Sequence, residues 1–283
     1  MGSSSSDSSL LLWLLGALLS VVTAYAALGW VRHAKYLEGW RRWGGVAAGA
    51  ALLGSGFTVA TVLGLAGEAF AFPLGFKRLW AIGLAVGAIV VALPILAIPA
   101  YRRNLLFSVG TALLLAALGV GIQIGWVMAV GFRPGISWRV EFVALGALAM
   151  AVGFSIALTL TFPDNDKKQR NEGWKLVAAA LMGLAWLAGE ALVLAGANLA
   201  VQVGSIYRHE LSGSLTALIG AGLLPIVLAF VIVDLELRRR HRRAGMRRRQ
   251  RKSSYRRLEG TGSAAAAAPT EAPPNPAPPL AQG

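Results

Sequence analysis

The sequence predicts an all-α membrane protein with seven transmembrane helices, an outer N-terminus and a cytoplasmic C-terminus. Three observations predict this fold class. The chain of 283 residues is 56% hydrophobic and only 14% charged, whereas a soluble domain carries about a quarter charged residues. Its apolar residues gather in runs of about 20 residues or more, which is long enough to cross a bilayer. Its Lys and Arg residues gather at alternate joints between those runs, as they do in membrane proteins of fixed orientation.

Each run is expected to be a helix, because lipid offers no hydrogen-bond partner to an open backbone. The first run, 10–31, could be a cleaved signal peptide, since Ala24-Tyr25-Ala26 resembles a cleavage site. A signal peptide begins with positive charge, whereas residues 1–9 contain no Lys or Arg, so we expect a retained helix. The later spans are predicted at 44–68, 80–100, 105–130, 140–162, 174–197 and 213–235.

The basic residues set the predicted orientation. Of the 27 Lys and Arg residues, 22 lie in the joints after the first, third and fifth spans or after the last span. The other side holds only Lys77, Arg78, Arg133, Arg139 and Arg208. Because the Lys- and Arg-rich side of a membrane protein faces the cytoplasm, residues 1–9 are expected on the outer side of the membrane. We expect a multi-pass protein of the plasma membrane.

Two segments follow the membrane domain 10–236. Residues 261–283 are rich in Ala and Pro and are expected to be disordered, because they have too few bulky apolar residues to form a core. Residues 237–260 are a basic juxtamembrane segment, which attracts anionic lipids by about 1 kcal/mol per basic residue near the surface. This segment can act as a topology anchor or bind lipid or a protein partner, and no nucleic acid is expected. Its candidate binding residues are Arg238, Arg239, Arg240, Arg242, Arg243, Arg247, Arg248 and Arg249.

The composition disfavours several classes of enzyme. The chain has no Cys, so it has no disulfide, no thiolate metal site and no cysteine nucleophile. Its three His residues, His33, His209 and His241, lie outside the predicted spans, which disfavours a haem or zinc centre in the membrane. Nothing in the sequence pairs Ser155 with a base. We expect no enzymatic activity and predict no cofactor.

Spans two, four and six are predicted to repeat one another. Each contains a Gly-rich stretch, and aligning the three stretches makes Thr61, Trp126 and Glu190 equivalent, at separations of 65 and 64 residues. Repeated helix units are a common way to build a membrane domain around a shared centre. Chance matches between small residues are the alternative. Pairs of glycines four residues apart are expected to let helix backbones approach closely; these are Gly45 with Gly49 and Gly121 with Gly125.

This pattern resembles the MHYT domain, a bacterial seven-helix sensor module with three such repeats. The resemblance covers residues 10–235 and also includes Arg42-Trp43 before the Gly-rich second span. It implies a membrane sensor of oxygen, carbon monoxide or nitric oxide that binds a metal such as copper, and members of this family often precede a cyclic-di-GMP enzyme domain. The Met-His positions of the family fall here on Ala60-Thr61, Gly125-Trp126 and Gly189-Glu190. None of these positions holds a His, whereas copper prefers imidazole and thioether ligands, so we expect no bound metal. The expected partner is a separate signalling protein.

Polar residues inside the spans predict a ligand site. An intramembrane carboxylate is costly and marks a functional site by default, and Glu190 is the deepest one. Thr61 and Glu68 are seven residues apart and share a helix face, as do Gln123 and Trp126 at a spacing of three. We predict a pocket in the outer half of the membrane, covered by His209-Glu210. It would be lined by Thr61, Gln123, Trp126 and Glu190, with Glu68 and Glu141 at its mouth.

Three functions remain open from the sequence. The leading hypothesis is an MHYT-like sensor or regulatory module whose metal or gas site is lost or altered. The second is a small transporter or permease in which Glu190 carries a proton, and the third is a non-catalytic assembly protein whose basic tail binds a partner. Glu190 can also be a structural carboxyl that is hydrogen-bonded to Gln123 or to a backbone carbonyl, or can hold a hard metal together with Glu68.

Overall fold

The computed structural model of the chain describes most of the membrane domain. The described residues are 3–34, 37–68, 72–101, 104–133, 135–162, 172–199, 204–207 and 210–212, with Val227, Phe230, Val231, Val233 and Asp234. The chain divides into two units, Met1–Asp234 and Leu235–Gly283, and all described residues belong to the first. The basic segment 237–260, with its candidate arginines, and the tail 261–283 therefore lie outside the described residues.

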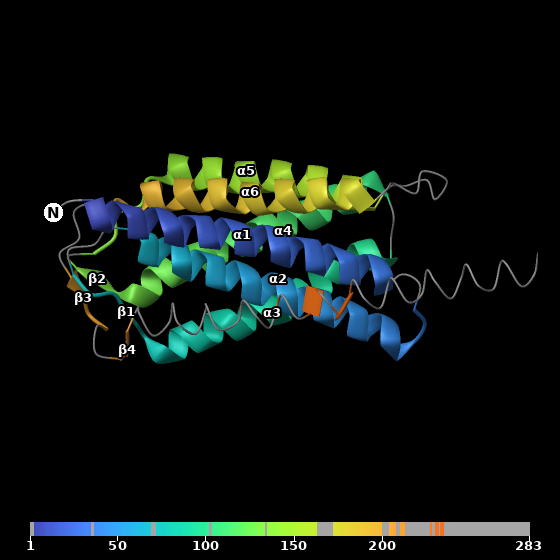
Figure 1. Cartoon of the computed structure of the whole chain (residues 1–283), viewed down its shortest axis with the longest axis horizontal. Coiled ribbons are helices and arrows are strands. Elements are labelled where there is room, and N and C mark those ends of the chain that lie inside the picture. Colours follow the sequence, from blue (N-terminus) through green and yellow to red (C-terminus); the bar gives the residue numbers. More distant parts are fainter. Residues whose placement is uncertain are drawn as a thin grey trace, which may run out of the picture. The chain divides into compact units, whose positions relative to one another are not determined.

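Six helices are long and apolar enough to cross a membrane, which makes the described part of the chain an all-helical membrane protein. They are α1 (Ser3–Ala34), α2 (Trp40–Gly67), α3 (Arg78–Tyr101), α4 (Leu105–Val130), α5 (Val140–Thr161) and α6 (Glu172–Gly196) (Figure 1). They confirm the first six predicted spans to within a few residues, except at the start of the chain. There α1 begins seven residues before the predicted Leu10, since a formed helix extends at little cost into a flanking polar segment.

The seventh predicted span, 213–235, lies largely outside the described residues. The five described positions within it are helical. Val227 and Asp234 are buried, whereas Phe230 and Val233 are exposed.

The six described helices pack in chain order, and α6 packs back against α1. The closest pairs are α1 with α2 and α5 with α6, and α2, α4 and α6 also touch one another. Helix α2 is buried over most of its length. Exposed large apolar side chains follow helical spacing on α3 and α5, as a lipid-facing surface requires; they include Leu79, Ile82, Val86 and Val90 on α3 and Leu145, Leu148, Val152 and Ile156 on α5.

Glycines set the spacing between α2 and its neighbours. A side-chain carbon added to Gly45 would lie 2.8 Å from the Cβ of Ala34, and one added to Gly49 would lie 2.7 Å from Cγ2 of Val31. The predicted close-packing role of this pair is therefore confirmed. The second predicted pair differs, because Gly125 meets Leu84 whereas Gly121 is exposed with open space around it.

Four short strands close one end of the bundle, here called the capped end (Figure 1). Strand β1 (Gly75–Phe76) pairs antiparallel with β4 (Leu211–Ser212), and β2 (Phe132–Arg133) pairs antiparallel with β3 (Gly204–Ser205). The Ser205 hydroxyl donates to the carbonyl oxygens of Val130 at 2.7 Å and Gly75 at 3.2 Å. These contacts join the segments that follow α2, α4 and α6, and α1 begins at the same end (Figure 1).

Candidate functional site

Glu190 is fully buried in α6 and lies against α2. A side-chain carbon on Gly64 would overlap the Glu190 carboxyl oxygen Oε1, so the carboxyl group rests directly on the α2 backbone. Neither Glu190 oxygen has a hydrogen-bond partner among the described residues. Burying a carboxyl group without hydrogen bonds is costly, so the position demands an explanation beyond packing.

Thr61 lies on the same face of α2, one turn from Gly64. Its side chain is fully buried, and its hydroxyl oxygen lacks a hydrogen-bond partner within the described residues. A threonine in a helix commonly donates to the carbonyl four residues earlier, as Thr111 does to Phe107 at 2.7 Å. Thr61 forms no such bond. Its hydroxyl oxygen can therefore take part in a site next to the contact between Gly64 and Glu190.

Gln123 on α4 contacts a methionine of α5. Its side-chain amide nitrogen lies 4.0 Å from the sulfur of Met150, and Met150 also packs against Gly189. The structure therefore corrects one alternative: Glu190 is bonded neither to Gln123 nor to any described backbone carbonyl, and the Gln123 amide meets the Met150 sulfur instead. The carbonyl oxygen of Gln123 is also buried without a described partner.

Trp126 is buried on α4 and points toward the cap. Its ring meets Phe76 of β1 edge-on, with centroids 5.3 Å apart, and its indole nitrogen has no described hydrogen-bond partner. Thr61, Gln123, Trp126 and Glu190 thus all carry buried polar atoms without partners, and all lie within about two turns of the capped ends of α2, α4 and α6.

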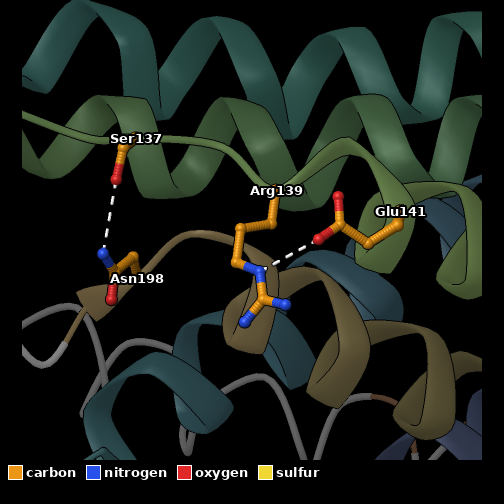
Figure 2. A network of polar contacts seen from close by, with 4 residues as sticks. All are labelled: Ser137, Arg139, Glu141 and Asn198. Atoms are coloured by element: carbon orange, nitrogen blue, oxygen red, sulfur yellow. Dashed lines mark hydrogen bonds and ion pairs between the residues drawn. The ribbon is translucent and has the colours of Figure 1, made fainter.

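The two acids predicted at the mouth differ in position. Glu68 directly follows α2, one turn beyond Gly64, and is half-buried. Burial raises the pKa of Glu68 above its ordinary value of 4.5. Glu141 instead forms an exposed ion pair with Arg139 at 3.0 Å, beside a hydrogen bond between Ser137 and Asn198 (Figure 2). Its carboxyl group points to Arg139 rather than into the buried group.

Of the predicted cover, Glu210 is exposed, and its carboxylate accepts a hydrogen bond from the backbone N–H of Arg78 at 3.1 Å. His209 lies outside the described residues. Glu210 therefore ties the cap together, between the segment after α6 and the start of α3.

An aromatic layer lies one turn farther from the cap. Phe57 of α2 stacks on Trp186 of α6 with ring centroids 4.0 Å apart and on Phe154 of α5 at 6.1 Å. All three rings are buried. On α2 and α6 these rings precede Thr61 and Glu190 by four residues, so they close the site on the side opposite the cap. The sequence pattern did not reveal this layer, because the three rings lie on three different helices.

A second buried charge lies near the uncapped end of α6. Lys175 is 2% exposed, and its ammonium nitrogen lies 3.9 Å from the centre of the Tyr25 ring on α1. Lys175 is one of the 22 basic residues predicted on the cytoplasmic side, and its side chain is buried within the bundle. Helical spacing could have predicted this burial, because Lys175 lies on the same face of α6 as Met182, Trp186 and Glu190. All four side chains are fully buried.

The donor set of the described site does not favour a transition metal. Within the described residues no three His, Cys, Asp or Glu side chains gather closely enough to hold a metal ion. The oxygens of Thr61, Gln123 and Glu190 suit a hard cation, a proton or a polar ligand better than copper. Comparisons with protein-family models, with curated proteins and with solved structures find no match to this chain.

Proposed function

We propose that this chain is a sensor module of the cell membrane that binds a small polar or cationic ligand at Glu190. The observation that carries the proposal is a fully buried carboxyl group without a described hydrogen-bond partner, beside the equally unpartnered hydroxyl of Thr61. Each buried polar atom left unpaired costs about 1–3 kcal/mol. A ligand that satisfies these atoms would therefore bind with a substantial gain and would change how α2 and α6 pack.

The surroundings of Glu190 favour sensing over transport. A transporter must open its site alternately to both sides of the membrane. Here the stacked rings of Phe57, Phe154 and Trp186 oppose access from the uncapped end, whereas the half-buried Glu68 leads toward the cap. With the capped end outside, as the distribution of Lys and Arg predicts, the module would take its ligand from the exterior and act on a separate partner in the cytoplasm.

The proposal agrees with the MHYT resemblance in seven spans, in the threefold repeat and in a site built from α2, α4 and α6. It departs from that family in the chemistry of the site, since Thr61, Trp126 and Glu190 stand at the repeat-equivalent positions. We therefore assign the metal-independent carboxyl site, rather than a gas-binding metal, as the input of this module.

Because the chain has no native Cys, single-cysteine variants can test the accessibility of the site without background labelling. The variant Thr61→Cys in oriented membrane vesicles is treated from one side at a time with Ag⁺, a thiol-reactive cation that is close to Na⁺ in size. The variants Ser137→Cys and Glu38→Cys, both at exposed positions, mark the capped and the uncapped side. We expect Thr61→Cys to react only with reagent added on the side from which Ser137→Cys reacts.

Reaction of Thr61→Cys from both sides would favour the transporter, with Glu190 as the proton-coupled residue. Reaction from the uncapped side alone, or from neither side, would contradict a site that is entered through the cap. The assembly-protein alternative depends on the basic segment 237–260. Deletion of that segment would remove a co-purified partner without altering the labelling of Thr61→Cys.

A further inference from the structure

We propose that the ligand at Glu190 is a single monovalent cation, either a proton or Na⁺, held between Glu190 of α6 and Thr61 of α2. The inference rests on the proposed function, because it names the ligand class of the same site. Its starting point is charge: the ionisable residue one turn beyond Gly64, where the Glu190 carboxyl group rests, is Glu68, another acid.

No described basic side chain neutralises this pair of acids. The buried cation of α6, Lys175, lies about four turns away and packs on Tyr25. Trp186 lies one turn before Glu190 on α6, but its indole N–H forms no hydrogen bond with the carboxyl group. A charged carboxylate in a low-dielectric interior requires a positive partner or a proton, so the compensating charge is expected from the ligand.

The size of the site limits the ligand to one small ion. The Glu190 carboxyl group rests on Gly64 with no room for one additional carbon on that residue, and the adjacent Gly189 is also packed tightly against Met150. A divalent ion is disfavoured as well, because Ca²⁺ takes six to eight oxygen ligands and no group of three His, Cys, Asp or Glu side chains gathers in the described residues.

The hydroxyl group of Thr61 independently supports a bound ion. Its hydroxyl oxygen is fully buried, lacks a described partner, and lies one turn from the Gly64–Glu190 contact on the same face of α2. A hydroxyl oxygen that makes no bond to its own helix can accept from a protonated carboxyl group or coordinate Na⁺ directly. Glu68, one turn beyond Gly64 on that face, would attract the cation on its way from the capped end.

The test is thermal unfolding of the purified full-length chain in detergent, with NaCl replacing N-methylglucamine chloride at constant ionic strength. If Na⁺ binds, Tm at alkaline pH rises by about 3–5 °C for each tenfold increase in Na⁺ above the dissociation constant. Acidic pH abolishes this rise, because a proton then occupies Glu190. If the proton is the physiological ligand, Tm instead rises on acidification and does not respond to Na⁺.

Three variants make the test specific. Glu190→Gln is expected to lose both responses, and Thr61→Val is expected to lose the Na⁺ response while it keeps the response to acid. Glu38→Gln, at an exposed carboxyl group near the uncapped end, is the control and keeps both. Should Glu190→Gln fail to fold, Gly64→Ala displaces the carboxyl group and weakens the same responses while Glu190 is retained.

Responses of Glu190→Gln, or of Gly64→Ala in its place, that match those of the native chain would overturn the cation assignment. This outcome is separable from failure of the proposed function. Labelling of Thr61→Cys from the capped side alone, together with cation responses that do not depend on Glu190, would leave a sensor site with a different ligand. Labelling from both sides would remove the sensor proposal even if a cation binds.

Discussion

Gly64 determines how closely Glu190 can approach α2. Because an added Cβ would overlap the Glu190 carboxyl oxygen, Gly64→Ala is expected to destabilise the protein by about 1–3 kcal/mol through overpacking. Gly87→Ala on α3 is the matched control, since open space surrounds that glycine. Thermal or denaturant unfolding of both variants measures the difference. Equal stability of the two variants would show that the Glu190 side chain moves aside without cost.

Glu68 is expected to make stability depend on pH. Burial raises its pKa in the native state above 4.5, so the folded chain holds this proton at pH values where the unfolded chain releases it. The contribution of Glu68 to the free energy of unfolding is therefore present below pH 4.5 and is lost as pH rises through the pKa of the folded state. Glu68→Gln should flatten that part of the profile in unfolding experiments across pH. Glu38→Gln controls for the loss of one charge, and parallel profiles of the native chain and Glu68→Gln would refute the prediction.

At the residue scale the sequence predicted four of the buried polar side chains, but not the groups that they contact. The placement of Thr61, Gln123, Trp126 and Glu190 in apolar spans was enough to predict buried polar groups in the half that bears the cap. Helical spacing cannot say that Gln123 meets Met150, because this contact depends on how α4 and α5 are placed in space. The exposed pairing of Glu141 with Arg139 likewise depends on the loop that starts α5.

Helix α6 is held to α1 by a buried cation–π contact. Tyr25→Leu removes the ring beneath Lys175 and is expected to cost about 2 kcal/mol, because the contact is shielded from water. The comparison variant is Tyr101→Leu, which removes a ring at the same distance of 3.9 Å from the guanidinium of Arg42. Tyr101 is 46% exposed, so the expected loss of stability is about 0.5–1 kcal/mol. Unfolding free energies of the two variants provide the measurement. A larger loss at Tyr101 would contradict the role assigned to burial.

At the element scale, the bounds of the six described helices were largely predictable, because lipid forces long apolar runs into helices. The order of packing was not. The pairing of α1 with α6, and the stacking of Phe57 on Phe154 and Trp186, join segments that are far apart in the sequence. Apolar runs composed of Ala, Leu and Gly carry little information about which face meets which neighbour.

The cap connects the far parts of the membrane domain through Ser205. Its hydroxyl donates to backbone carbonyls that follow α2 and end α4, so Ser205→Ala is expected to destabilise the protein by about 1 kcal/mol and to speed hydrogen exchange at β1 and β2. Ser137→Ala, at an exposed serine with one long bond of 3.4 Å to Asn198, should change stability by less than about 0.5 kcal/mol. Unchanged exchange at β1 would argue against a single connected cap.

At the scale of the whole molecule, the class of protein followed from composition, because few charges and long apolar runs leave little alternative to a bilayer. The short strands of the cap were not predicted, since two-residue strands leave no alternation of apolar and polar residues in the sequence. Orientation and the seventh span still depend on the positive-inside pattern. Labelling of Glu38→Cys and Ser137→Cys from opposite sides will test both the direction and the alternation of the described spans.

The central position of α2 has a consequence for biogenesis. This helix has the lowest mean hydropathy of the six described spans, and its threonines and all its glycines except Gly44 are buried in the bundle. During translation it must nevertheless leave the translocon before α3 to α6 exist. Its most extensive partner, α1, is already in the bilayer at that moment, so the two helices can insert as a preassembled hairpin. Because α1 is synthesised first, α2 can bury its small and polar residues against α1 as soon as it enters the bilayer.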